Sequence, residues 1–271
     1  MNIYRFKEFI LFEGGKVFGS TTRRINRNEI PSTMTDIEAR LLPVLKAKDY
    51  KNLGSAGNKP TSGDIDIGIK DFEPSQQKYD ALKEAFPNYE IKWSKGLSLM
   101  SIAWPIEGKE GGDFVQVDII PIKHLDWTEF VYKFPKDSEY TSSHRNWLIA
   151  AICSVLTDVT SRDLEGNVHT FNGYMFKLND GFFEQKRSYK GKNGLLKNSY
   201  KVSEKKITSD PREMVKFLFG KEIELEDVET LEQCLNIIKR PGYKWSKNLS
   251  KIKQQYREFL NRQGLKIPSE L

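Results

Sequence analysis

The chain of 271 residues carries a formal net charge of +6 at pH 7, with 38% hydrophobic and 30% charged residues. This balance is typical of a globular protein with one large core or two modest ones and excludes a disordered or fibrous chain. Its longest apolar runs are too short to cross a bilayer and no cleavable secretory signal is evident, so the sequence predicts a cytoplasmic protein with no membrane partner.

The first predicted element is a helix from Thr35 to about Asp49. The residues Thr35 to Glu38 have the form of a capping box, in which Thr35 would cap the helix and Glu38 would reach back to it. Pro43 inside this stretch predicts a kink or an early end. The expected inner face consists of Ile37, Leu41, Leu42 and Leu45.

Several strands and one helix are predicted next. A short strand covers Asn52 to Ser55, and Asp64-Ile65-Asp66-Ile67-Gly68-Ile69 alternates apolar and acidic residues. Alternation with period two is typical of a strand, so the isoleucines are expected on one face and the aspartates on the other. Further along we expect a helix at 74–86 and strands at 89–93, 97–104 and 114–120.

The remaining elements are mainly helical. A helix is predicted at 144–156, followed by a hairpin with strands at 173–178 and 182–189 around the turn residues Asn179-Asp180-Gly181. Three further helices are expected near 211–219, 228–238 and 246–261. The cysteines, Cys153 and Cys234, fall in apolar helical stretches and are expected to be buried free thiols, which suits a reducing compartment.

This order of elements predicts an α+β (mixed α/β) protein with a mixed β-sheet flanked by helices. We expect an N-terminal arm at 1–34, a catalytic core at 35–140 and a basic C-terminal domain of hairpin and helices at 141–271. Charge supports the division, because residues 182–271 hold 20 Lys/Arg against 12 Asp/Glu and the rest of the chain leans acidic. The sequence leaves the oligomeric state open.

Three aspartates form the candidate catalytic site. Asp64 and Asp66 lie two apart on one predicted strand, and Asp118 lies in the apolar strand Val115 to Ile120. Carboxylates gathered on one face would repel each other unless cations bind between them. Their hard oxygen ligands favour Mg²⁺ or Mn²⁺, and two such ions could assist an in-line phosphoryl displacement.

These residues resemble a known signature. Leu53-Gly54-Ser55, then Ser62-Gly63-Asp64-Ile65-Asp66-Ile67, and later Val117-Asp118-Ile119 are similar to the motifs of the polymerase-β-like nucleotidyltransferase superfamily. The likeness covers roughly Leu53 to Pro121. It implies that Asp64 and Asp66 hold both metals, and that Asp118 holds the catalytic metal and helps to deprotonate the acceptor.

The resemblance also implies nucleotide contacts. Gly54 and Ser55 would grip the triphosphate of an NTP such as ATP, and Ser62 of the same motif is a further candidate. Many members have an arginine shortly after the Gly-Ser pair; here Lys59 is the candidate cation, with a solvated lysine as the alternative. Arg145 at a predicted helix N-terminus could also reach an anion, with an ordinary surface arginine as the alternative.

The acceptor is less explicit in the sequence. The run from Lys186 to Lys206 holds eight basic residues and one acid, which suggests a nucleic-acid contact. Its aromatic neighbours could stack on bases or pack into a core; they are Phe182, Phe183, Tyr189 and Tyr200. We therefore expect transfer to a nucleic-acid (RNA) 3′ end. The alternatives are a superfamily member that modifies a protein or small molecule and an inactive nucleic-acid-binding relative.

The N-terminus carries a second resemblance. The segment from Met1 to Glu13 is similar to the short N-terminal peptides of proteins packaged into the heads of large tailed bacteriophages. Leu11-Phe12-Glu13-Gly14 resembles the cleavage site of their head protease. This resemblance implies a bacteriophage-encoded protein that could be packaged in the virion, with an amphipathic N-terminal helix as the alternative.

Overall fold

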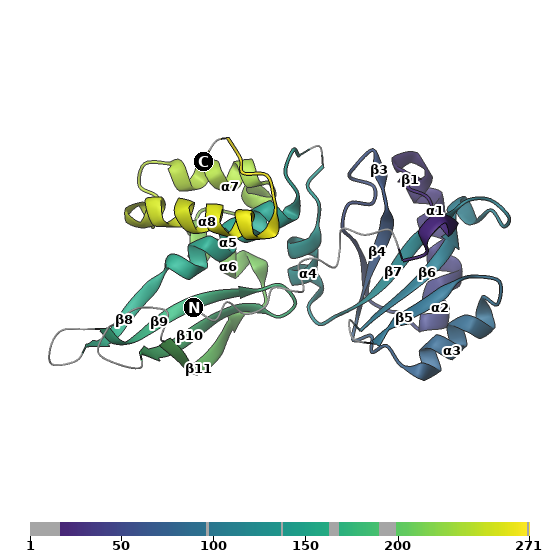
Figure 1. Cartoon of the computed structure of the whole chain (residues 1–271), viewed down its shortest axis with the longest axis horizontal. Helices are drawn as coiled ribbons and strands as arrows, with labels where there is room; N and C mark the ends of the chain where they lie inside the picture. The colour runs from purple at the N-terminus through teal and green to yellow at the C-terminus, as the bar shows by residue number, and fades with distance from the viewer. Residues whose placement is uncertain (1–16, 96–97, 137, 163–167, 190–198, 270) are drawn as a thin grey trace. The chain divides into compact units, whose positions relative to one another are not determined.

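A computed structural model describes residues 17–95, 98–136, 138–162, 168–189, 199–269 and 271. The described chain divides into two compact units, the first within residues 17–136 and the second from Ser138 onward. Both units combine helices with β-strands (Figure 1), so the predicted α+β class is confirmed. No described helix has the length and apolar character needed to span a membrane. The resemblance to bacteriophage peptides concerns residues 1–13, which lie outside the described residues.

A mixed five-stranded sheet forms the centre of the first unit. Its strand order is β2-β4-β7-β6-β5, and only the central pair, β4 and β7, is parallel. The strands are β2 (Tyr50–Leu53), β4 (Asp64–Lys70), β7 (Phe114–Ile122), β6 (Leu99–Pro105) and β5 (Ile91–Ser94). A separate two-stranded ladder joins β1 (Ile25–Asn26) to β3 (Thr61–Ser62).

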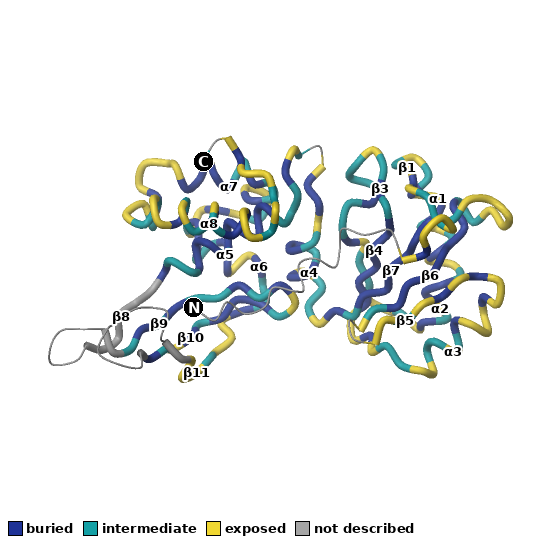
Figure 2. Tube along the Cα trace, viewed as in Figure 1, coloured by how far each residue is buried: buried dark blue, intermediate teal, exposed yellow. Residues whose placement is uncertain are grey.

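The predicted alternation along β4 separates the two faces of this sheet. Its isoleucines are fully buried in the main apolar core, together with residues of α1 (Ile30–Asp36), α2 (Leu42–Leu45) and α3 (Gln76–Ala85). On the other face Leu53, Ile120 and Ile122 form a small cluster with residues of α4 (Leu125–Tyr132), a helix that the sequence did not predict. Both faces of the central strands are therefore buried (Figure 2).

The predicted capping box at Thr35 is wrong. Helix α1 already begins at Ile30, after reciprocal side-chain to backbone hydrogen bonds between Asn26 and Glu29. Thr35 lies inside α1, where its hydroxyl donates to the carbonyl of Pro31 at 3.0 Å. The predicted inner face is confirmed, since Ile37, Leu41, Leu42 and Leu45 are all buried.

A π-helical stretch at Ile37–Leu41 interrupts the helix just before Pro43, where a kink or an early end was predicted. The N–H of Leu42 bonds to the carbonyl of Ile37, five residues back, just before a proline that has no N–H to donate. The helix then ends at Leu45, earlier than the predicted Asp49, and the next residue, Lys46, has a left-handed φ of 55°.

The second unit packs helices on a four-stranded antiparallel sheet with strand order β11-β10-β9-β8. The predicted hairpin is confirmed as β9 (Val168–Lys177) and β10 (Gly181–Tyr189), whereas β8 (Thr157–Arg162) and β11 (Ser199–Thr208) were not predicted. The helices are α5 (Ser142–Val155), α6 (Pro211–Phe219), α7 (Leu231–Lys239) and α8 (Leu249–Gln263). Cys153 and Cys234 are buried free thiols, as expected.

Candidate metal centre

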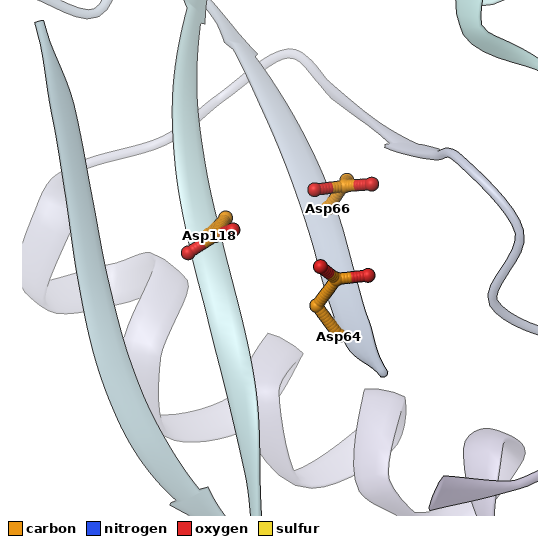
Figure 3. A group of neighbouring side chains, drawn as sticks. All are labelled: Asp64, Asp66 and Asp118. Carbon is orange, nitrogen blue, oxygen red and sulfur yellow. The ribbon is translucent and has the colours of Figure 1, made fainter. Parts of the chain in front are cut away.

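The three aspartates meet on one face of the first unit's sheet. Strands β4 and β7 are parallel and in a register that places Asp66 opposite Asp118, with Asp64 two residues before Asp66 on the same face. One carboxylate oxygen from each lies within 4.8 Å of the other two. Figure 3 shows the two carboxylates of β4 beside that of β7. The sequence pattern therefore predicted a real cluster.

Burial makes this cluster electrostatically costly when it is empty and ionised. Asp64, Asp66 and Asp118 are all buried. Burial raises the pKa of Asp66 well above its usual value, and the charges of Asp64 and Asp118 raise it further. Oδ1 of Asp66 has no hydrogen-bond partner within the described parts of the chain. A hard divalent cation fits this donor set, because it would satisfy that oxygen and offset the repulsion.

Two polar neighbours hold Asp118. Ser101 on β6 donates its hydroxyl to Oδ1 at 2.6 Å, and the Gln116 amide donates to Oδ1 and Oδ2 at 3.1 and 2.9 Å. Burial still outweighs these hydrogen bonds and raises the pKa of Asp118 to about 6. Sequence reasoning missed both neighbours, although Gln116 could have been found because it lies two residues before Asp118 on the same strand face.

Gly54 lies directly against the cluster. A Cβ atom at this position would lie 2.2 Å from Oδ2 of Asp66, closer than any real contact, and the backbone has a left-handed φ of 69°. Glycine is therefore required at this position for two reasons: the backbone is left-handed, and any Cβ atom would collide with the carboxylate of Asp66. The close approach of Gly54 to Asp66 places the predicted Gly-Ser motif next to the predicted Asp-x-Asp motif.

The other three candidates, Ser55, Lys59 and Ser62, follow Gly54 in the chain. The hydroxyls of Ser55 and Ser62 are 3.2 Å apart, and Ser62 is buried. The ammonium of Lys59 lies 4.2 Å from the ring centroid of Phe134, whose N–H donates to the carbonyl of Gly54. Ser55 is therefore the more accessible of the two serines, and the aromatic ring of Phe134 holds Lys59.

Arg145 belongs to the second unit. It is on α5 close to the helix N-terminus, as predicted, but its side chain is buried inside that unit. Its guanidinium donates to the carbonyl of Glu229 at 3.0 Å, and burial lowers its pKa to about 10. The structure thus gives Arg145 a hydrogen bond inside its own unit, where a surface arginine or a triphosphate contact was expected.

The basic run divides over both faces of the second unit's sheet. In the register of β10 and β11, Lys201 lies opposite Arg187 on one face, whereas Lys186 lies opposite Ser203 on the other. Residues 190–198 of the run and the side chains of Tyr189 and Tyr200 lie outside the described part. Phe182 and Phe183 are buried, so they pack into the unit and do not offer open stacking surfaces.

The stability of the metal-free protein should depend on Asp118 in a defined pH window. Its pKa is about 6 in the folded state and about 3.9 in an unfolded chain. Between these values the folded state binds more protons, so the contribution of Asp118 to stability is complete below pH ~4 and is lost as the pH rises through ~6. Two pKa units correspond to roughly 3 kcal/mol.

Denaturant unfolding in EDTA at pH 4 and pH 7 measures this effect. The difference between wild type and Asp118→Asn reports the contribution of Asp118, including the part of the Asp66 pKa shift that the charge of Asp118 causes. We expect the asparagine variant to gain relative stability at pH 7. Equal pH slopes in the two proteins would contradict the raised pKa.

The chain matches no protein-family model and no curated protein. What the protein does is therefore inferred from the chemistry of its own residues.

Proposed function

We propose that this protein is a metal-dependent nucleotidyltransferase that moves a nucleoside monophosphate from a nucleoside triphosphate to an acceptor hydroxyl and releases pyrophosphate. The observation that supports the proposal most strongly is the convergence of Asp64, Asp66 and Asp118 in one buried cluster. Gly54 supports it further, because the Gly-Ser motif lies directly against the carboxylate of Asp66.

The residues of the cluster have separate tasks in this reaction. Asp64 and Asp66 would hold Mg²⁺ or Mn²⁺ together with Asp118; two such ions, when bound, neutralise the triphosphate and stabilise the attacking and leaving oxygens. Asp118 would also take the proton of the acceptor hydroxyl as a general base. Its pKa is raised to about 6 without metal, and bound cations would lower it, so the carboxylate would be ionised at neutral pH.

We propose a nucleic-acid 3′ end, RNA in particular, as the acceptor. Support comes from the charge of the chain after Phe182, where Lys and Arg outnumber Asp and Glu by 20 to 12. Phosphate backbones bind such surfaces with strong salt dependence. The buried Phe182 and Phe183 argue for binding through charge and not through base stacking at these two rings.

Incubation with each α-labelled nucleoside triphosphate, Mg²⁺ and total RNA tests the proposal. Label on RNA supports the proposed acceptor, and label on protein or on a small molecule supports nucleotidyl transfer but contradicts the acceptor. No transfer of any label, with RNA binding retained, would overturn the enzymatic proposal in favour of a binding protein. An EDTA control should abolish any transfer.

The Ser55 hydroxyl should contribute to triphosphate binding. A charge-assisted hydrogen bond from this hydroxyl contributes ~1.5–3 kcal/mol, so Ser55→Ala should weaken nucleotide binding by roughly ten- to a hundredfold. Ser62→Ala is the matched control, because Ser62 is buried behind Ser55 and contacts its hydroxyl. We expect a smaller effect there. Calorimetric titration with a non-hydrolysable triphosphate measures both, and unchanged affinity in Ser55→Ala would place the triphosphate elsewhere.

A further inference from the structure

Gln116 connects Asp118 to a distant part of the chain. Its side-chain Nε2 donates to both carboxylate oxygens of Asp118, at 3.1 and 2.9 Å. Its Oε1 accepts a hydrogen bond from the main-chain N–H of Val17 at 2.9 Å. Gln116 is only 1% exposed. Both ends of one buried amide are therefore in use, one on the candidate metal ligand and one on the backbone 99 residues away.

The two ends of an amide are chemically opposite, so the Val17 contact determines what Asp118 meets. An N–H at Oε1 keeps the amide oxygen away from the cluster and directs the NH₂ group toward the carboxylate. The reverse orientation would place the glutamine oxygen against a carboxylate and its NH₂ group against the N–H of Val17. Both contacts would be repulsive in a buried environment.

Several contacts fix the segment that begins at Val17. The ammonium of Lys92 donates to the carbonyl of Val17 at 2.7 Å and lies 5.0 Å from the ring centroid of Phe18, which is buried. A few residues on, the N–H of Arg23 donates to the carbonyl of Phe114 at the start of β7. The segment 17–23 thus runs beside the strand that carries both Gln116 and Asp118.

We propose that Gln116 is a positioning residue for Asp118, and that the main-chain N–H of Val17 controls it. The segment at Val17 and Phe18 then regulates the metal affinity of the carboxylate cluster through the side-chain amide of Gln116. This inference rests on the proposed function, since it requires the cluster to bind metal. Ser101 holds Oδ1 of Asp118 independently, with no contact to Val17 among the hydrogen bonds described.

Loss of a residue that hydrogen-bonds to a metal ligand typically weakens metal binding by 10–100-fold. Gln116→Met keeps the length of the side chain and removes both hydrogen-bonding ends, so we expect Mn²⁺ to bind on the order of tenfold more weakly. Val17→Pro removes the N–H that orients the amide and should weaken Mn²⁺ binding by several-fold. Val17→Ala is its reference, because it changes the same exposed side chain and retains the N–H.

A double-mutant cycle separates positioning from general damage. If Val17 acts only through Gln116, Val17→Pro should have no additional effect on Mn²⁺ affinity in the Gln116→Met background. A structural effect would instead add in both backgrounds. Mn²⁺ dissociation constants from electron paramagnetic resonance, measured on the full chain without nucleotide, provide the readout, and thermal unfolding verifies that each variant is folded.

The outcomes are distinct. Weaker Mn²⁺ binding in Gln116→Met and a non-additive Val17→Pro support the proposal. Mn²⁺ affinity at the wild-type level in folded Gln116→Met, or additive effects in the cycle, would overturn it and leave the metal centre intact. A wild-type protein that binds no Mn²⁺ would overturn both this proposal and the proposed function.

Discussion

Replacing Asp118 by asparagine should lower nucleotide transfer by on the order of a hundredfold or more. The variant keeps the shape of the side chain but removes the charge that would bind metal and accept the acceptor's proton. The protein should stay folded, and at neutral pH it should be as stable as wild type or more stable without metal. The reason is that burial already opposes the ionised form, raising the pKa of Asp118 to about 6.

Single-turnover transfer of labelled nucleotide, together with thermal unfolding in EDTA, measures both parts of this prediction. Asp126→Asn is the matched control, because it removes an exposed carboxylate from α4 in the same unit. The control should keep the wild-type rate. Asp118→Asn protein that is well folded and retains substantial activity would contradict the role given to Asp118.

The sequence was most informative where two local rules agreed. Period-two alternation placed the aspartates of β4 on one face, and an apolar strand with one central aspartate placed Asp118 on the same kind of face. Their closeness then required only that β4 and β7 be neighbours. By contrast, Thr35 and Glu38 match the capping-box pattern but do not cap a helix. The helix has already begun by then, after the capping box of Asn26 and Glu29, which starts nine residues earlier.

Contacts between distant residues could not be predicted in this way. The bond from Ser101 to Asp118 depends on the pairing of β6 with β7, and the bond from Val17 to Gln116 depends on where a segment without regular structure lies. Neither of these two hydrogen bonds leaves a periodic pattern in the sequence from which it could be predicted. The buried state of Arg145 is another example, since a helix N-terminus in sequence gives no information about what packs over it.

These distant contacts also explain the electrostatics of the centre. Local sequence predicted repulsion between carboxylates, but not that Asp118 accepts three hydrogen bonds while Oδ1 of Asp66 accepts none within the described residues. The two aspartates are therefore unequal. Asp66 is the carboxylate that most needs a cation, and Asp118 is the one whose orientation is set in advance.

Gly54→Ala should damage the centre severely while Gly57→Ala should not. Both glycines have a left-handed φ, 69° and 83°, so both variants lose roughly 1–2 kcal/mol of stability from backbone strain. Only at Gly54 would the new Cβ collide with Asp66, at 2.2 Å from Oδ2; at Gly57 its nearest neighbour is Cγ2 of Ile30 at 3.9 Å. A displaced Asp66 should lower transfer by on the order of a hundredfold.

The collision can be separated from the strain by a second change at the same contact. Asp66→Ala removes the carboxylate that the new Cβ would meet, so Gly54→Ala should cost less stability in that background than in wild type. Denaturant unfolding of the four proteins gives the coupling energy between the two positions, independently of activity. A coupling near zero, or equal losses of activity in Gly54→Ala and Gly57→Ala, would show that the Gly-Ser turn does not support Asp66.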